Sequence, residues 1–294
     1  MAKQYEFPTR GLPYLLVLPQ MAIVVVFFFL PAGQAIWQSF YLQDPFGGKV
    51  IFVGFENYVK LFRDPSYGDS FAVSTLFAGL VTVSSMALAL FLADQANKGI
   101  RLSDFYKTML IWPYAVATVV AGVLFLFMFN PNVGVVAYML KHRFGVEWNH
   151  LLDTTHAVTL ITLAASWKQI AYNFVFFLAG LHAVPAPLVE AAAIDGASPF
   201  RRFWAIIFPL LSPTTFYLLV MNLVYGFFET FPIVHQVTAG GPGKATAILV
   251  YKVWRDGVIN LDLGGSAAQS VVLMVLVIAL TVLQFRFIER KVTY

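Results

Sequence analysis

The chain is 294 residues long, with 59% hydrophobic and 12% charged residues, a formal net charge of +4 and no cysteine. Soluble domains carry about 25% charged residues, so this composition excludes an ordinary water-soluble fold and favours a helical bundle in a membrane. The lack of cysteine excludes disulfides, thiolate metal sites and a cysteine nucleophile. The cations are scattered through short loops without forming a stripe, so no nucleic-acid partner is expected.

Six apolar segments are long enough to cross a membrane as helices. A span needs about 20 mostly apolar residues, and backbone amides in hydrocarbon must bond within their own segment. The first segment is too long for the apolar core of a cleavable signal peptide. The six predicted spans are Leu12–Ser39, Phe71–Leu92, Phe105–Phe129, Ala157–Leu181, Pro213–Val234 and Ala267–Phe287.

Lysines and arginines near the span ends predict the orientation of the chain. With six spans, both termini lie on one side of the membrane. That side has the shorter loops and ten cations, against eight on the other side, so we expect both termini in the cytoplasm. The ten are Lys3, Arg10, Lys98, Arg101, Lys107, Arg201, Arg202, Arg286, Arg290 and Lys291.

The predicted cytoplasmic loop at 182–213 contains two short helices joined at a glycine. Pro187 suits the first turn of a helix, and Leu188–Ile194 is rich in helix formers. Gly196 permits left-handed backbone after that helix. Ser198 followed by a proline is typical of the start of the next helix. The pattern therefore predicts a helix–glycine–helix elbow lying across the membrane face.

The elbow carries a small-residue surface beside two acids. Its alanines allow another surface to approach closely, and Glu190 and Asp195 offer acidic contacts next to them. The alternative is an interfacial helix that rests among lipid headgroups. Phe203 and Trp204 fit that alternative, but a compact alanine-rich turn flanked by two acids does not.

The same loop resembles the EAA motif of binding-protein-dependent ABC importer permeases. Glu190-Ala191-Ala192, three residues, Gly196, nine residues and Ile206-x-Phe208-Pro209 match that motif, with Phe208 where the family usually has Leu. In the family this loop is the coupling helix that docks into a groove of the ATPase subunit. The resemblance implies that the coupling contact is made by Glu190, Ala191, Ala192, Asp195 and Gly196.

The resemblance extends over nearly the whole chain. The stretches at 52–58 and 238–251 are similar to the first and last outside loops of sugar-type permeases. Further stretches resemble, more narrowly, the permeases of this family that import sn-glycerol-3-phosphate. They are Leu12–Val17, Trp112–Ala117, Phe129–Pro131, Trp167–Ile170, Asn173-Phe174, Glu190–Ala197 and Ser266–Met274.

The family implies an all-α, six-span fold of the type I ABC importer (MetI-like) kind. An N-terminal helix and first periplasmic loop would occupy residues 1–66, and the transport domain 67–288, with the coupling loop at 185–209. The implied partners are a second, homologous permease, two ATP-binding subunits, a periplasmic solute-binding protein and the lipid of the bacterial inner membrane. The implied cargo is sn-glycerol-3-phosphate or a glycerophosphodiester, and the alternative is a sugar or polyol.

The chain shows no sign of powering transport itself. Gly243-Lys244 lacks the following Ser or Thr and the earlier glycine of a phosphate loop, so we expect ATP to be bound by a partner and this chain to need no cofactor. The five histidines have no metal-ligand spacing, and no catalytic motif occurs. A secondary transporter would show inverted repeats or coupling carboxylates, and a membrane enzyme a nucleophile cluster; neither pattern is present.

Polar residues within the spans are candidates for the substrate path, because such residues are costly in lipid. Lys168 could attract a phosphate dianion and the amides could bond glycerol hydroxyls. The alternatives are a structural pairing of Lys168 with Glu229 or with a carbonyl, or a lysine that reaches an interface. The candidates are Lys168, Gln169, Asn173, Asn222, Tyr225, Glu229 and Gln269.

Overall fold

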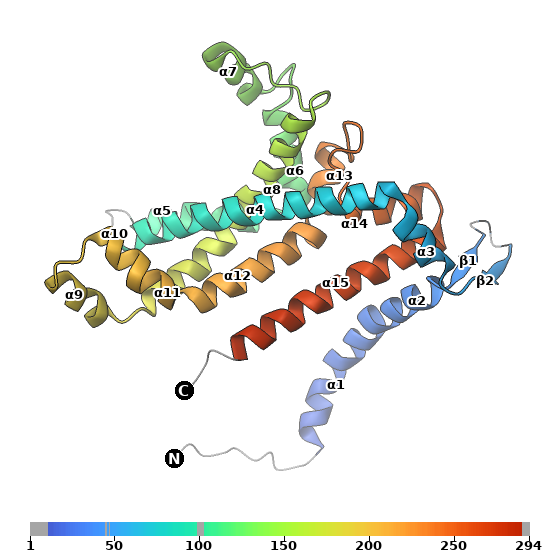
Figure 1. Ribbon diagram of the computed structural model, residues 1–294, viewed down its shortest axis with the longest axis horizontal. Helices are drawn as coiled ribbons and strands as arrows, with labels where there is room; N and C mark the ends of the chain where they lie inside the picture. The colour runs from blue at the N-terminus through green and yellow to red at the C-terminus, as the bar shows by residue number, and fades with distance from the viewer. Residues whose placement is uncertain (1–10, 45, 47, 99–102, 290–294) are drawn as a thin grey trace. The chain divides into compact units, whose positions relative to one another are not determined.

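The computed structural model describes residues 11–44, 46, 48–98 and 103–289. Five cations used to predict orientation, Lys3, Arg10, Arg101, Arg290 and Lys291, lie outside these residues. The protein is mostly helical, which confirms the predicted class (Figure 1). Its contacts divide it into two units, one formed by 1–64 and 253–275, the other by 65–252 and 276–294.

The first unit contains the N-terminal apolar helix and a small hairpin. The hairpin strands pair antiparallel, with Tyr41 opposite Phe52. Neither the hairpin nor the short amphipathic helix that follows it was among the predicted elements. The elements are α1 (Leu12–Val24), the π-helical turn η1 (Val25–Phe29), α2 (Leu30–Gln38), β1 (Tyr41–Gln43), β2 (Val50–Phe52), α3 (Glu56–Arg63) and the π-helical turn η4 (Arg255–Ile259).

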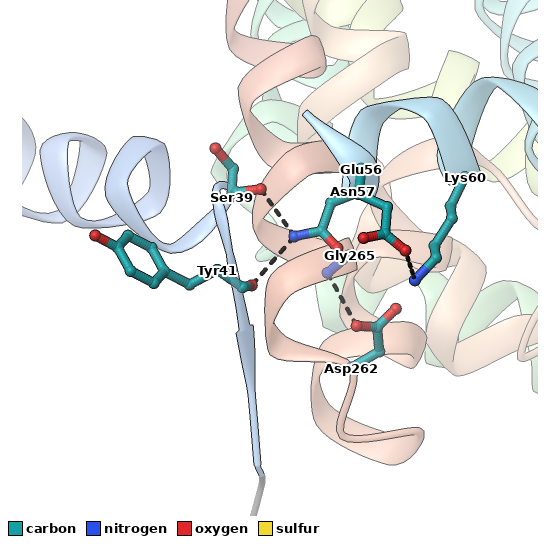
Figure 2. Close-up of polar contacts among 7 residues, drawn as sticks. All are labelled: Ser39, Tyr41, Glu56, Asn57, Lys60, Asp262 and Gly265. Carbon is teal, nitrogen blue, oxygen red and sulfur yellow. Dashed lines mark hydrogen bonds and ion pairs between the residues drawn. The ribbon is translucent and has the colours of Figure 1, made fainter. Parts of the chain in front are cut away.

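One buried asparagine organises the first unit (Figure 2). Asn57, from α3, donates its amide hydrogens to the carbonyl oxygens of Ser39 at 2.8 Å and Tyr41 at 3.1 Å, which fixes the exit from α2. A Cβ at Gly264 would stand 2.3 Å from the same Tyr41 oxygen. Only a glycine therefore lets the start of α15 (Leu263–Glu289) approach this corner.

The second unit contains the remaining elements, and α14 and α15 each contribute residues to both units. In Figure 1, α7 lies at the N-terminal end of α8 and α9 at its C-terminal end. The elements are α4 (Pro65–Asn97), α5 (Ser103–Ala115), α6 (Thr118–Met128), α7 (Val135–Phe144), α8 (Thr154–His182), α9 (Ala186–Ile194), α10 (Pro199–Arg202), η2 (Phe203–Ile207), α11 (Phe208–Leu210), α12 (Ser212–Val224), η3 (Tyr225–Glu229), α13 (Phe231–Val237) and α14 (Leu249–Trp254).

The core of the second unit lies between α4, α8 and α12, where apolar side chains are shielded on all sides. Phe174 and Phe177 of α8 are almost completely buried there, against Ala89 and Ala93 of α4 and Leu218 of α12. Elsewhere the helices expose many large apolar side chains. That distribution suits a protein whose outer surface meets lipid.

Among the described residues, three helices are long and apolar enough to cross a membrane alone: Leu12–Gln38, Pro65–Asn97 and Leu263–Arg286. The described chain has up to six spans if each of three bent helix pairs counts as one. The predicted third span, Phe105–Phe129, is not one continuous helix, because α5 and α6 meet at a bend of 102°. Pro113, which lacks a backbone N–H, stands two residues before the break.

Candidate functional site

The predicted elbow is present at the C-terminal end of α8. Helix α9 begins after Pro185, whose extended backbone separates it from α8, and the two helices form an angle of 69°. At its end the Ala197 amide donates to the Ala192 carbonyl at 2.9 Å, and the Gly196 amide donates to Ala193 at 3.1 Å. This pair of bonds is a Schellman motif, and its left-handed position is Gly196, with φ of +81°.

The helix after the glycine starts as the sequence predicts. The Ser198 hydroxyl accepts a hydrogen bond from the Arg201 amide at 3.3 Å and so caps the first turn of α10. Helical structure then continues through η2 and α11 to Leu210, and α12 leaves at an angle of 69°. The aromatic side chains of Phe203, Trp204 and Phe208 pack against one another along this stretch.

The surface of α9 is available to a partner. None of its residues is buried. Glu190, Ala191, Asp195 and Gly196 are exposed, and Ala192 is half-buried. Within the described chain neither Glu190 nor Asp195 is engaged in an ion pair. The elbow therefore presents small side chains and two uncommitted carboxylates, as the coupling role requires, and that role stays a prediction.

Two of the substrate-path candidates are joined inside the core of the second unit. Asn222 donates to the side-chain oxygen of Asn173 at 2.7 Å, and Asn173 donates back to Asn222 at 3.1 Å. Ser85 of α4 donates to Asn222 at 3.1 Å and accepts from Asn173 at 3.1 Å. Both asparagines are 0% exposed. These bonds support a structural connection of α4, α8 and α12 rather than direct contact with cargo.

Substituting Asn222 by Leu is expected to lower the free energy of unfolding by about 1–3 kcal/mol, because it leaves the side-chain oxygen of Asn173 buried without its donor. Denaturation in detergent micelles measures this loss. The double variant Asn173→Leu with Asn222→Leu should cost less than the sum of the two single variants, because it removes both members of the pair. Strict additivity would contradict the bonded pair.

Lys168 reaches the break in the predicted third span. It is half-buried on α8, and its ammonium group donates to the carbonyl oxygens of Tyr114, at 3.3 Å, and Val116. The ammonium also lies 5.8 Å from the centre of the Tyr114 ring. The structure thus shows Lys168 paired with backbone carbonyl oxygens. This pairing is one of the alternatives to contact with cargo that were predicted from the sequence.

The remaining candidates of the second unit differ in exposure. Gln169 and Tyr225 are buried, and Tyr225 donates to the carbonyl oxygen of Ala165 at 3.5 Å. Glu229 is exposed, although its spacing from Asn222 and Tyr225 predicts a shared helix face. The π-helical turn η3 between them explains the difference, because it alters the direction in which later side chains point.

Gln269 belongs to the first unit, where its side chain bonds to the turn formed by η4. Its amide donates to the carboxylate of Asp256 at 2.9 Å, and Asn260 donates to the other oxygen of that carboxylate at 3.0 Å. Both Gln269 and Asp256 are buried. Neither Asp256 nor Ser85 was among the residues predicted from the sequence. The sequence feature that could have marked Ser85 is its small hydroxyl side chain within the apolar run of α4.

The loop before α8 holds two titratable groups with shifted pKa values. The Asp153 carboxylate accepts a hydrogen bond from the His156 amide at 2.9 Å and caps α8, and this bond lowers the pKa of Asp153. His150 is buried, and burial lowers the pKa of its imidazole because the charged form is poorly solvated there. These residues lie at the N-terminal end of α8, whereas the elbow follows the C-terminal end of that helix.

Comparison with known protein families identifies the architecture. A family model described as binding-protein-dependent transport system inner membrane component matches residues 85–294. The chain belongs to this family. The EAA-type elbow at 190–209 falls within the matched region of the permease, as do all the substrate-path candidates from Lys168 to Gln269.

Several curated relatives of this permease are similar over nearly their full length. A Rhizobium meliloti (strain 1021) protein is 57% identical over 288 residues, covering 98% of both chains. A Brucella suis protein is 57% identical over 292 residues and a Pectobacterium atrosepticum protein 54% over 288, covering 97–99% of each chain. All three are named sn-glycerol-3-phosphate transport system permease protein UgpA.

Solved structures support the same fold. A chain of a bacterial ABC transporter involved in the import of the acidic polysaccharide alginate matches with a TM-score of 0.82 at 19% identity, covering 96% of both chains. A chain of a bacterial alginate ABC transporter in complex with a periplasmic protein bound to an alginate pentasaccharide gives a TM-score of 0.77 at 19% identity, covering 93% of this chain and 92% of the other. The type I ABC importer permease fold is thereby confirmed for this chain.

Proposed function

We propose that this permease translocates sn-glycerol-3-phosphate, with glycerophosphodiesters as related cargo, across the bacterial inner membrane. The observation that carries the proposal is the 52–57% identity, over nearly the whole chain, to relatives that bear that name. An identity of this level over the transport helices supports a shared cargo more strongly than the common fold does, because one fold serves many functions.

The energy for transport comes, in this proposal, from two separate ATP-binding subunits that bind the elbow. The exposed surface of α9 with its two uncommitted carboxylates supports that assignment. A second homologous permease completes the channel, and a periplasmic solute-binding protein delivers cargo to the outside loops. Both termini lie in the cytoplasm, so the elbow faces the ATPases. Residues 1–66 form the accessory helix and loop, and 67–288 the transport domain.

Uptake into proteoliposomes tests the proposal. The permease is reconstituted with its partner permease, ATPase and binding protein, and radiolabelled sn-glycerol-3-phosphate or maltose is supplied from the side of the binding protein. We expect accumulation of sn-glycerol-3-phosphate that requires ATP and the ATPase subunit. Accumulation of maltose instead would assign a sugar cargo. Uptake that persists without the ATPase would overturn the importer assignment altogether.

A further inference from the structure

The break between α5 and α6 leaves backbone acceptors without helical donors. A continuing helix would supply an amide hydrogen to each carbonyl four residues earlier. Here Ala117 adopts an extended ψ of 141° and the chain turns by 102°, so carbonyls at the end of α5 and in the break that follows it lose those donors. The Val116 amide bonds to Pro113, which satisfies one of them. In hydrocarbon the others need a partner from elsewhere in the protein.

Lys168 supplies that partner from the neighbouring helix. Its ammonium donates to the carbonyl oxygens of Tyr114 and Val116, on the two sides of Ala115. Both α5 and α6 pack against α8, so a side chain from α8 can reach the bend between them. A cation at the C-terminal end of a helix is also favoured by the helix dipole.

Aromatic contacts extend this connection to a third helix. The Tyr114 ring stacks on Tyr172, one turn after Lys168 on α8, with centroids 6.1 Å apart. The hydroxyl of Tyr172 lies 3.0 Å from that of Tyr217 on α12. The end of α5 is thus held by α8 directly and linked to α12 through Tyr172.

We propose that Lys168 is a positioning residue that caps the broken third span and fixes its bend, instead of binding the anionic group of the cargo. An ammonium group has three donors, and two of them are directed to carbonyl oxygens. The ammonium group therefore donates hydrogen bonds to backbone carbonyl oxygens that lipid cannot satisfy. Its positive charge lies at the C-terminal end of α5, where the helix dipole stabilises it. Loss of the cap releases α5 from α8 and changes the bend that shapes the path.

Because the sequence contains no cysteine, labels attached to two introduced cysteines can measure the bend directly. Cysteines replace Tyr106 on α5 and Phe127 on α6, which are both exposed, and carry nitroxide labels. The distance distribution between the labels is recorded by pulsed electron paramagnetic resonance in the whole importer, with cysteine-free partner subunits. KM and the maximal rate of uptake are measured on the same preparations.

Three substitutions separate capping from cargo binding. Lys168→Met removes every donor and should broaden or shift the distance distribution and lower the maximal rate at least fivefold. Lys168→Arg and Lys168→Gln keep a donor, so they should restore the distribution, with KM within about twofold of the unsubstituted protein. Lys141→Met removes an exposed cation of α7 and serves as the control that leaves the distribution unchanged.

Two outcomes would overturn the proposal. One is an unchanged distance distribution in Lys168→Met; the other is failure of both Arg and Gln to restore it. If Lys168→Met does not assemble, Lys168→Gln distinguishes the two roles. A tenfold or larger rise in KM with an unchanged distance distribution would make Lys168 a cargo ligand. An unchanged KM supports the cap. The distance measurement needs no cargo, so its result is independent of the proposed substrate.

Discussion

Replacement of Gly196 by Val is expected to reduce ATP-driven uptake at least tenfold while the permease still inserts in the membrane. Gly196 holds a left-handed backbone with φ of +81°, and no atom lies within 4 Å of the place of a Cβ. The cost is therefore conformational: left-handed backbone costs an ordinary residue roughly 1–2 kcal/mol, and a β-branched one is a stronger outlier. The Schellman end of α9 should rearrange, and with it the surface that we propose binds the ATPase.

Gly145 provides a matched control for this variant. It ends α7 with φ of +68°, also without neighbours within 4 Å. Gly145→Val introduces the same kind of backbone strain in the loop between α7 and α8, away from the elbow, and should leave coupled ATP hydrolysis and uptake near normal. Uptake and cargo-stimulated ATPase activity are measured for both variants. Full coupling in Gly196→Val would refute the assignment of the elbow as the docking surface.

Replacement of Gly226 by Ala is expected to lower the free energy of unfolding by about 1–3 kcal/mol, the usual range for overpacking a tightly filled site. The π-helical turn η3 and α4 approach so closely here that a Cβ would lie 2.7 Å from the Cβ of Ala78 and 2.8 Å from its Cα. Because the second atom belongs to the backbone, a helix must move to admit the methyl group. Denaturation in micelles measures the loss.

Gly79, the neighbour of Ala78 in α4, is the control for this prediction. A Cβ there meets nothing within 4 Å, so Gly79→Ala should be neutral or gain about 0.5–1 kcal/mol from improved helix propensity. Adding Ala78→Gly to Gly226→Ala should restore only part of the stability, because the backbone at position 78 still obstructs the new methyl group. Equal stability of the Gly226 and Gly79 variants would show that α4 and η3 do not pack closely.

The positions of the apolar helices follow from the sequence, but their interruptions do not. Pro113 lies in an uninterrupted apolar run, where a proline is compatible with a slight kink or with a complete break. The 102° bend depends on donors for the carbonyl oxygens that it frees, and these come from Lys168, about fifty residues away along the chain. Local pattern alone carries no information about such a partner.

The elbow was predictable in detail because its signals are local. Gly196 and Ser198 specify a helix end and a helix start through bonds to residues within five positions, and both are observed. The roles of Asn173 and Asn222 depend instead on which helices face one another. Their polarity marked them in the sequence, but their mutual bonds and the contribution of Ser85 required the tertiary structure.

The corner at Asn57 has a consequence for biosynthesis. Asn57 and the Tyr41 carbonyl leave the ribosome early, whereas Gly264, which fits against that carbonyl, is about 200 residues later; at 5–20 residues per second the gap is roughly 10–40 s. During this time the N-terminal helix must wait in the lipid with its corner incomplete. The exit from the N-terminal helix therefore reaches its final packing only after the last helix has been made.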